Sequence, residues 1–297
     1  MKKSSLFVFL CFTFLYSSEI HNYRVLNYSI TYKDKNYTIL RAFEQERKNY
    51  YLAVDESGLK TQILSDKIVN SSIKNSTQKT TYSRLLNQYT KAPYLLQNYG
   101  LKHLLSDKIF LTIDMCPSKK KGYEQSFFET LSKYRKKAIP IVVFISGKWI
   151  KSHYGEFLSL RKMQSDGLLE ITWGNHTLNH FYDAKRKLEE NFILTPGINI
   201  EDEILENEKL LLSYGITPSI LFRFPGLVSD KNSVNILNRL GLIPVASDAW
   251  LAKGEEIKNG SIVLVHGNKN EPFGIKKAKD FIEKNSDFIF GSILDNL

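Results

Sequence analysis

The stretch Ile171-Thr-Trp-Gly-Asn-His-Thr-Leu-Asn-His180 places two histidines, His176 and His180, four residues apart after a short run that reads as a β-strand. On a helical turn, side chains at this spacing point the same way, so both imidazoles can reach one divalent cation. Zincin metalloproteases share the spacing but need a glutamate after the first histidine, and Thr177 stands there instead. The chain has only six histidines, so a pair beside a Gly-Asn turn favours a metal site over two unrelated surface histidines.

Four further apolar runs, like the one before the histidine pair, end on a charged or titratable residue. In chain order, the five runs end on Asp114, the histidine pair, Arg223, Asp248 and His266. A β/α barrel builds its site in this way, from residues at the ends of core strands on one face of the molecule. The sequence therefore predicts one site made from five strand ends.

Strand-like and helical patterns alternate from residue 109 onward. We expect strands at 109–114, 140–146, 168–173, 219–224, 242–248, 261–266 and 287–292, and helices at 123–137, 154–166, 201–214, 231–240 and 274–284. The alternation predicts a parallel α/β arrangement, but by itself it does not separate a barrel from an open doubly wound sheet. No glycine-rich phosphate loop follows a strand and no G-x-S-x-G elbow is present, so we expect no nucleotide and no serine nucleophile of that type.

Taken in order, these segments resemble the five motifs of the metal-dependent polysaccharide deacetylase family. The family motifs T-F-D-D-G-P, H-[ST]-x-x-H, R-x-P, Asp-Trp and L-x-H correspond to Thr112-Ile-Asp-Met-Cys-Pro117, His176–His180, Arg223–Pro225, Asp248-Ala-Trp250 and Leu264-Val-His266. The second, third and fifth motifs are matched in full, and the fourth is loosened by one residue. The resemblance covers residues 105–297 and implies an irregular parallel β/α barrel of about seven strands.

The resemblance also implies a role for each motif residue. The histidine pair would hold a divalent metal, for which Zn²⁺ is the expected ion, and Asp114 would act as general base. Arg223 would keep that carboxylate ionised. His266, oriented by Asp248, would protonate the leaving nitrogen. Around the acetyl group the resemblance places the backbone N–H of Gly226, which follows Pro225, and the side chains of Trp250 and Leu264.

The first motif departs from the family at Met115, which replaces the aspartate that would ligate the metal. A thioether is a poor ligand for zinc. Three possibilities remain open: Asp114 turns toward the metal, Cys116 or another carboxylate ligates it, or the two histidines bind it with water. Met115 falls on the strand face opposite Asp114, so we expect it to pack in the core. We retain Asp114 as the base and expect Cys116 to be a small buried residue.

The composition is that of a globular protein with one substantial core, because 42% of the 297 residues are hydrophobic and 12% are aromatic. The formal net charge is +10, which suits an anionic polymer such as the cell wall but also fits a lysine-rich proteome. The sequence has no arginine-rich stripe and no nucleic-acid-binding motif, so we expect no nucleic-acid partner.

The N-terminus has the pattern of an export signal. Met1-Lys-Lys3 is a basic start, and the apolar run from Leu6 to Leu15 is shorter than the ~20 residues of a membrane span. We expect residues 1–18 to be a signal peptide or an uncleaved anchor, and the protein to be periplasmic or secreted. Cys11 lies in this segment, which leaves Cys116 as the one thiol of a cleaved chain and excludes an internal disulfide there.

Residues 19–80 differ from the rest of the chain. Alternating patterns predict a small antiparallel β unit with strands at 23–32, 37–42, 50–55 and 59–64. The Ser-, Asn-, Lys- and Thr-rich stretch 69–81 reads as a linker, and a helical pattern follows at 82–99. We assign residues 81–297 to the deacetylase-like domain and leave the role of the β unit open.

Three functions are compatible with these residues. The first is a metal-dependent hydrolase that removes acetyl groups from an extracytoplasmic polysaccharide, such as the N-acetyl groups of peptidoglycan. Ester-linked acetyl groups would suit the same residues. The second is a non-catalytic glycan-binding protein on a degraded deacetylase scaffold, and the third is a metal-independent amidohydrolase of the same fold. The retained acid, base and histidine positions favour the first.

Overall fold

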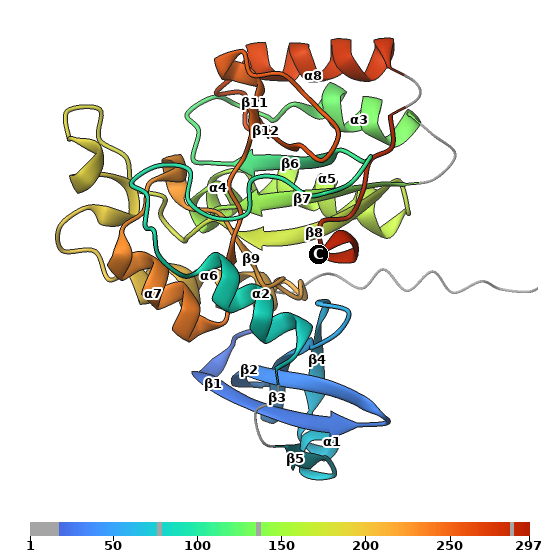
Figure 1. The fold of residues 1–297 in the computed structure, drawn as a ribbon, viewed down its shortest axis with the longest axis vertical. Helices are drawn as coiled ribbons and strands as arrows, with labels where there is room; N and C mark the ends of the chain where they lie inside the picture. Colours follow the sequence, from blue (N-terminus) through green and yellow to red (C-terminus); the bar gives the residue numbers. More distant parts are fainter. Residues whose placement is uncertain (1–17, 76–78, 135–137, 286–287) are drawn as a thin grey trace, which may run out of the picture.

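The computed structural model describes residues 18–75, 79–134, 138–285 and 288–297. These residues form a five-stranded sheet from the first part of the chain and a seven-stranded sheet from the remainder (Figure 1). The predicted export signal, residues 1–18, lies outside the described residues except for Ser18. Among the described helices, none combines the length and the apolar character that crossing a membrane requires.

The first sheet is antiparallel, with the strand order β4-β3-β2-β1-β5. Its strands are β1 (His21–Tyr32), β2 (Lys35–Gln45), β3 (Lys48–Asp55), β4 (Thr61–Ser65) and β5 (Ile73–Asn75), with helix α1 (Asp66–Asn70) before the last. Lys33 and Asp34 join β1 to β2 with positive φ angles of 49° and 60°, as a tight hairpin requires. The predicted β unit is confirmed, but the stretch read as a linker contributes the end of α1 and all of β5.

The second sheet is parallel throughout, with the strand order β10-β9-β8-β7-β6-β12-β11. Its strands are β6 (Phe110–Met115), β7 (Ile139–Ile145), β8 (Leu169–Asn175), β9 (Leu221–Phe222), β10 (Ile243–Pro244), β11 (Ala249–Trp250) and β12 (Ile262–His266). Together with its helices, this sheet confirms the predicted parallel β/α-barrel class. The seventh strand is β11. The strand predicted at 287–292 is wrong for its described part, where Phe290 forms only an isolated bridge to Ile109.

In the part of the chain that the structure describes, seven α-helices follow the first sheet or surround the second (Figure 1). They are α2 (Thr81–Tyr89), α3 (Gln125–Lys133), α4 (Gly147–Ser152), α5 (Tyr154–Ser165), α6 (Ile200–Ser213), α7 (Lys231–Leu240) and α8 (Pro272–Lys284). Short 3₁₀ helices occur at η1 (Leu188–Glu190), η2 (Phe192–Leu194), η3 (Pro225–Leu227), η4 (Leu251–Lys253) and η5 (Leu294–Asn296). The predicted helix at 82–99 ends early, at Tyr89, four residues before Pro93, which cannot donate a backbone hydrogen bond. Helix α4 was not predicted.

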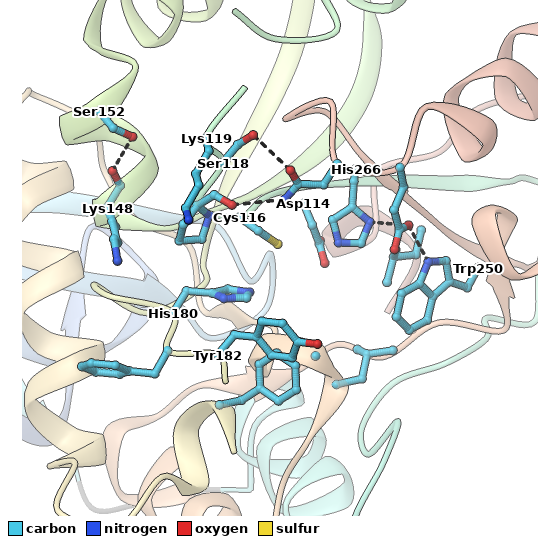
Figure 2. A pocket seen from close by; sticks show the side chains of 18 residues that line it. Asp114, Cys116, Ser118, Lys119, Lys148, Ser152, His180, Tyr182, Trp250 and His266 are labelled. Carbon is cyan, nitrogen blue, oxygen red and sulfur yellow. Dashed lines mark hydrogen bonds and ion pairs between the residues drawn. The ribbon is translucent and has the colours of Figure 1, made fainter. Parts of the chain in front are cut away.

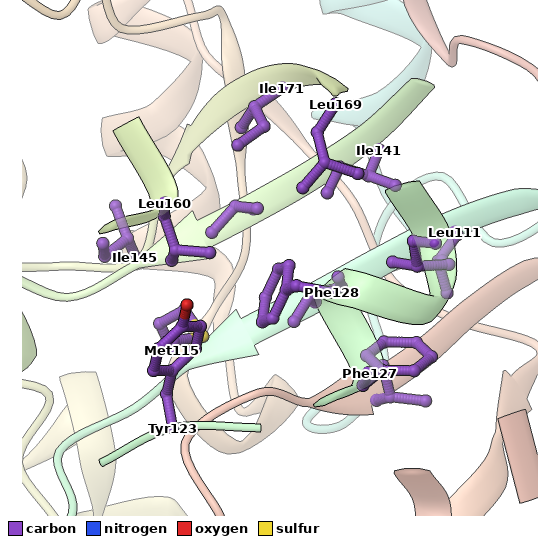
Figure 3. Close-up of a cluster of buried hydrophobic side chains, with 14 of the residues drawn as sticks. Leu111, Met115, Tyr123, Phe127, Phe128, Ile141, Ile145, Leu160, Leu169 and Ile171 are labelled. Atoms are coloured by element: carbon purple, nitrogen blue, oxygen red, sulfur yellow. The ribbon is translucent and has the colours of Figure 1, made fainter. Parts of the chain in front are cut away.

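Strand β6 lies inside the parallel sheet, between β7 and β12, and all its residues are buried. Successive side chains on a strand point to opposite faces. Ile113 and Met115 join the large cluster that includes Phe128 of α3 (Figure 3). Met115 is 0% exposed, which confirms the prediction that it packs in the core. Thr112 and Asp114 therefore point to the other face, the interior of the barrel.

The first sheet packs directly against the barrel. Leu40 and Val54 of its strands, with Leu59 from the turn between β3 and β4, share an apolar cluster with barrel residues such as Phe110 and Ile220. Tyr82 of α2 donates a hydrogen bond to the carbonyl of Gly241, the residue that ends α7. Gly241 has a φ of 73°, and a side chain there would collide with Tyr82 and Leu40. The N-terminal unit is thus in close apolar and polar contact with the barrel.

Candidate active site

The parallel register brings most of the predicted residues to one edge of the second sheet, the one at the carboxyl ends of its strands. His266 is the register partner of Asp114, and Asn175, just before the first histidine of the pair, is the partner of Phe222, just before Arg223. Strands that run in parallel bring their carboxyl ends to the same edge, which is where β/α barrels place their sites. A cavity of about 640 Å³ opens there (Figure 2), and its lining includes Asp114, Cys116, His180, Gly226, Trp250 and His266.

Asp114 and Arg223 form a buried ion pair at the end of β6. The Arg223 Nη1 atom donates to Asp114 Oδ1 at 2.7 Å and to the Thr112 hydroxyl at 2.8 Å. Its other nitrogens donate to the carbonyls of Val245 and Ala246, which fixes the guanidinium. Burial raises the pKa of Asp114, but the charge and hydrogen bond of Arg223 outweigh it and hold that pKa below its usual value. Asp114 is therefore ionised and oriented, as predicted for a base.

The histidine pair lies on a loop after β8. The helical turn expected there is wrong, because residues 176–180 form no helix and Thr177 and His180 have positive φ angles of 65° and 47°. The two rings are nevertheless close, with centroids 4.7 Å apart. His176 Nδ1 lies 2.8 Å from the carbonyl oxygen of Arg223, so Nδ1 donates there and Nε2 is left on the side of Cys116 and Asp114. Burial lowers the pKa of His176 to about 4, which keeps the imidazole neutral.

Contacts from two helices hold this loop in place. The backbone N–H groups of Gly147 and Lys148, at the start of α4, donate to the carbonyls of Thr177 and Leu178. Glu203 of α6 accepts from both the backbone and the side chain of Asn179, at 2.8 and 2.6 Å. Positive φ is costly for residues other than glycine, and such strain persists only where the surroundings hold it. The loop geometry is therefore imposed by α4 and α6, and the local sequence alone does not set it.

Cys116 follows β6 and brings its thiol to the histidine pair. Its Sγ lies 3.4 Å from His176 Nε2, and ligand atoms of Cys116, His176 and His180 all lie within 4.8 Å of one another. The residue is a free thiol and is buried, as predicted, but it lies in the site and not in the apolar core. Burial raises its pKa, but the charges of His180 and His266 outweigh this and lower the pKa to about 7.

His266, at the end of β12, is oriented by Glu271. The Nδ1 atom of His266 lies 2.8 Å from Glu271 Oε2, which also accepts from the indole N–H of Trp250 at 2.9 Å. Burial lowers the pKa of His266, but the negative charge of Cys116, the hydrogen bond to Glu271 and the charge of Asp114 outweigh it, so that pKa is held well above its usual value. His266 is therefore protonated in this arrangement, as a general acid must be.

Asp248 does not take the role predicted for it. Its carboxylate accepts from the backbone N–H of Ile262 at 2.9 Å, and its Oδ2 lies 2.8 Å from His103 Nδ1. The prediction that Asp248 orients His266 is therefore wrong. Glu271 was missed because it belongs to no motif, although a carboxylate five residues after the last motif histidine was a signal that could have been used.

The residues predicted around the acetyl group are partly assembled. Trp250, Leu264 and Gly226 line the cavity, whereas Pro225 is buried and begins η3. Gly226 has a φ of 61°, and a side chain there would collide with the ring of Phe192. This position therefore requires glycine, which allows a close approach of the backbone to a ligand.

The rim of the cavity carries residues that sequence reasoning missed. Lys119 and Lys148 are exposed and line the cavity, and Figure 2 shows Lys148 on the side of His180, away from Trp250. Tyr182 also lines it and stacks on Phe192 with ring centroids 5.1 Å apart. These residues lie on loops and on α4, outside the family motifs, so no pattern in the sequence placed them here.

The donor atoms at the histidine pair suit a divalent metal. His180 Nε2 is shielded from solvent and has no hydrogen-bond partner among the described residues. A buried polar atom without a partner costs free energy unless a ligand satisfies it. Two imidazoles beside a thiol form a nitrogen and sulfur donor set of the kind that zinc prefers. The residues present therefore fit the metal that the resemblance implies.

This combination of a strand-end cavity, a held carboxylate and a histidine pair defines a hydrolase site of the β/α-barrel class. The polysaccharide deacetylase family model matches residues 102–245, a segment that contains the first three motifs. The resemblance stated from the motifs is thereby confirmed for the segment 102–245, which matches the polysaccharide deacetylase model. This match supports the predicted enzyme class, a carbohydrate deacetylase.

Several solved structures are similar to this chain. A family 4 carbohydrate esterase from Bacillus anthracis is 20% identical, with 75% of this chain and 94% of that chain covered and a TM-score of 0.49. Bacillus subtilis PdaA, also a family 4 carbohydrate esterase, is 19% identical, with 75% and 90% covered and a TM-score of 0.49. A BA3943 mutant, described as a CE4 family pseudoenzyme with restored enzymatic activity, is 15% identical, with 95% and 93% covered and a TM-score of 0.46.

Proposed function

We propose that the protein is a metal-dependent deacetylase of an extracytoplasmic polysaccharide, with the N-acetyl groups of peptidoglycan as its substrate and Zn²⁺ as its metal. The observation that carries the proposal is the pairing of opposite proton-transfer groups across one cavity. Asp114 is held ionised by Arg223, and His266 is held protonated beside Glu271. Hydrolysis of an amide needs both a base for the water and an acid for the leaving nitrogen.

Asp114 is the proposed base. Its Oδ1 atom is occupied by Arg223, and its Oδ2 atom lies 3.7 Å from His176 Nε2, on the side of the histidine pair. A water between them would give its proton to Oδ2. When bound at the histidine pair, a divalent metal would supply Lewis-acid polarisation of the water and the acetyl carbonyl.

His266 is the proposed acid. Because its Nδ1 is held by Glu271, the other ring nitrogen carries the proton that the departing amine needs. The backbone N–H of Gly226 is the proposed donor to the carbonyl oxygen as negative charge develops there. Trp250 and Leu264 would enclose the methyl group and exclude water from it.

The cavity rim supports an anionic glycan as substrate. Lys119 and Lys148 are exposed lysines at the edge of the cavity, where they would attract the carboxylates of a peptide-bearing polymer. Tyr182 is 65% exposed, and its ring offers a flat apolar face on which a sugar can stack. Peptidoglycan has both features, and the export pattern in residues 1–18 supports a periplasmic or secreted protein that would meet it.

A second candidate is a metal-independent amidohydrolase that uses Cys116 as nucleophile. Ligand atoms of Cys116, His266 and Asp114 lie within 4.8 Å of one another, and Glu271 orients His266. This order of thiol, imidazole and carboxylate is that of an activated cysteine. The thiolate would attack the acetyl carbon, the C–N bond would break with a proton from His266, and water would then hydrolyse the acetyl thioester.

Acetate release tests the proposal. Purified protein is incubated with peptidoglycan and, separately, with uncharged chito-oligosaccharides, before and after removal of metal by a chelator. We expect release from peptidoglycan, loss of release after chelation, and recovery with added Zn²⁺. Release that is indifferent to the chelator would favour the thiol mechanism, and no release from any acetylated glycan would leave a binding protein.

A further inference from the structure

We propose that Cys116 is the third protein ligand of the metal, in place of the carboxylate that Met115 replaces. This inference rests on the proposed metal-dependent function and assigns the ligand set of that site as His176, His180 and Cys116. It makes the metal centre of this protein a nitrogen and sulfur site, whereas the family pattern has two histidines and an aspartate.

The distances support a shared ion. In a tetrahedral zinc site the metal lies ~2.0–2.1 Å from histidine nitrogen and ~2.3 Å from cysteine sulfur, so these two ligand atoms are about 3.6 Å apart. Cys116 Sγ is 3.4 Å from His176 Nε2, and His180 completes a set of ligand atoms within 4.8 Å. Figure 2 shows the Cys116 sulfur between His180 and Asp114.

The unpartnered nitrogen of His180 is an independent observation. Its Nε2 atom is buried and has no hydrogen-bond partner among residues 18–75, 79–134, 138–285 and 288–297. His176 Nδ1, in contrast, is hydrogen-bonded to the Arg223 carbonyl, so only its Nε2 is available to a ligand. Two nitrogens and one sulfur therefore converge at one point, where a single ion can contact all three.

Asp114 is less suited to be the third ligand. Its Oδ1 is committed to Arg223 at 2.7 Å, and its carboxylate belongs to no three-membered group with both histidines among the described residues. Ligation by Cys116 leaves Asp114 Oδ2 free to accept a proton.

The path of the backbone explains why residue 116, and not residue 115, can supply the third ligand. Met115 turns its side chain into the helix-facing core, where its sulfur packs near Gly267 and Phe128. Residues two apart on an extended chain share a face, so Cys116 follows Asp114 on the cavity side. The Asn268 side chain donates to the Cys116 carbonyl at 2.7 Å and fixes the chain at this point. A thiol at 116 can therefore replace a carboxylate at 115.

Cobalt substitution of the full chain tests the assignment. Co²⁺ bound by a thiolate shows an intense sulfur-to-metal charge-transfer absorption, which carboxylate and imidazole ligands do not give. We expect wild-type protein to show this absorption with one Co²⁺ per chain. Cys116→Asp should bind Co²⁺ without the absorption, and Cys116→Ala should bind Zn²⁺ about 100-fold more weakly or worse. Met115→Leu is the matched control and should keep both the absorption and the affinity.

Alkylation gives a second readout that is independent of the Ala variant's folding. Cys116 modification by iodoacetamide, followed by peptide mapping to separate it from Cys11, should slow at least about 10-fold when Zn²⁺ is present, because a ligated thiolate is not free to react. Equal rates with and without Zn²⁺ would overturn the assignment, as would a Co²⁺ complex of wild-type protein without charge-transfer absorption.

The outcomes separate the ligand assignment from the proposed function. A Co²⁺ complex without the sulfur absorption, together with chelator-sensitive acetate release, would overturn the ligand assignment alone. The sulfur absorption without acetate release would support the ligand assignment and overturn the deacetylase proposal. No metal binding by the wild-type protein would overturn both.

Discussion

Two buried arginines make a direct comparison between the active-site edge and the contact of the N-terminal sheet with the barrel. Arg223 pairs with Asp114 at 2.7 Å, and Arg41 of β2 pairs with Glu208 of α6 at 2.8 Å. Both guanidiniums are 0% exposed. The two ion pairs thus have the same chemistry and the same burial. One lies at the cavity and the other at the contact between the N-terminal sheet and the barrel.

The two pairs differ in how many oxygens of the carboxylate accept hydrogen bonds from protein groups. Both oxygens of Glu208 accept hydrogen bonds from Arg41, and Oε2 accepts another from the Tyr23 hydroxyl. Asp114 gives one oxygen to Arg223 and lines the cavity. A fully satisfied buried pair can only hold the structure together, whereas one that keeps an oxygen at a cavity can also accept a proton.

The largest expected effect is on catalysis, at the pair that faces the cavity. Asp114→Asn keeps the size of the side chain but removes the proton acceptor, so kcat for acetate release should fall by about 10²–10⁴-fold. Steady-state kinetics on an acetylated glycan measures it. A kcat within about threefold of wild type would remove Asp114 from the role of base.

The pair at the N-terminal sheet should respond in stability and not in rate. Glu208→Gln leaves Arg41 buried without its counter-charge, which should cost about 3–5 kcal/mol of unfolding free energy. Denaturant unfolding measures the loss, and kcat below the transition should match wild type. If this variant lowers kcat as Asp114→Asn does while remaining folded, the distinction between the two pairs fails.

A smaller effect is expected at Glu271, a positioning residue that acts through His266. Glu271→Gln can still accept the His266 N–H but no longer stabilises its charge, so kcat should fall about 10-fold with KM nearly unchanged. Glu271→Ala should be lower still, and the partial rescue by glutamine separates positioning from mere packing. Asp248→Asn is the matched control and should leave kcat unchanged, because Asp248 bonds to His103 and Ile262 instead.

The smallest effect is expected at the cavity rim. Replacing both Lys119 and Lys148 with alanine should raise KM for peptidoglycan about three- to tenfold at low salt, and high salt should reduce the difference. The KM for an uncharged chito-oligosaccharide serves as the control and should not change. Equal losses on both substrates would argue against recognition of an anionic polymer.

The comparison also shows what the sequence could predict. The Asp114–Arg223 pair was accessible because each residue ends an apolar run, and parallel strands bring such ends together. The Arg41–Glu208 pair joins residues 167 positions apart on a sheet and a helix, and neither residue belongs to a motif. Nothing local in the sequence indicates that these two side chains meet.

Inside the site, too, some contacts could not be predicted from the local sequence. The spacing of His176 and His180 predicted that their rings would converge. It did not predict that a loop held by α4 and α6 would bring the two rings together. Side-chain alternation placed Met115 in the core, yet the approach of Cys116 to His176 depends on how the chain bends after β6. The strand ends were predictable, and the loops that complete the site were not.

Metal content and acetate release of the variants His176→Ala, His180→Ala and the double variant show directly whether the histidine pair is the metal centre of a deacetylase. We expect the double variant to bind no stoichiometric metal and to release no acetate while retaining its fold, because two of three ligands are lost. Full metal occupancy in the double variant, or acetate release at the wild-type rate, would contradict the assignment of this site as a metal-dependent deacetylase centre.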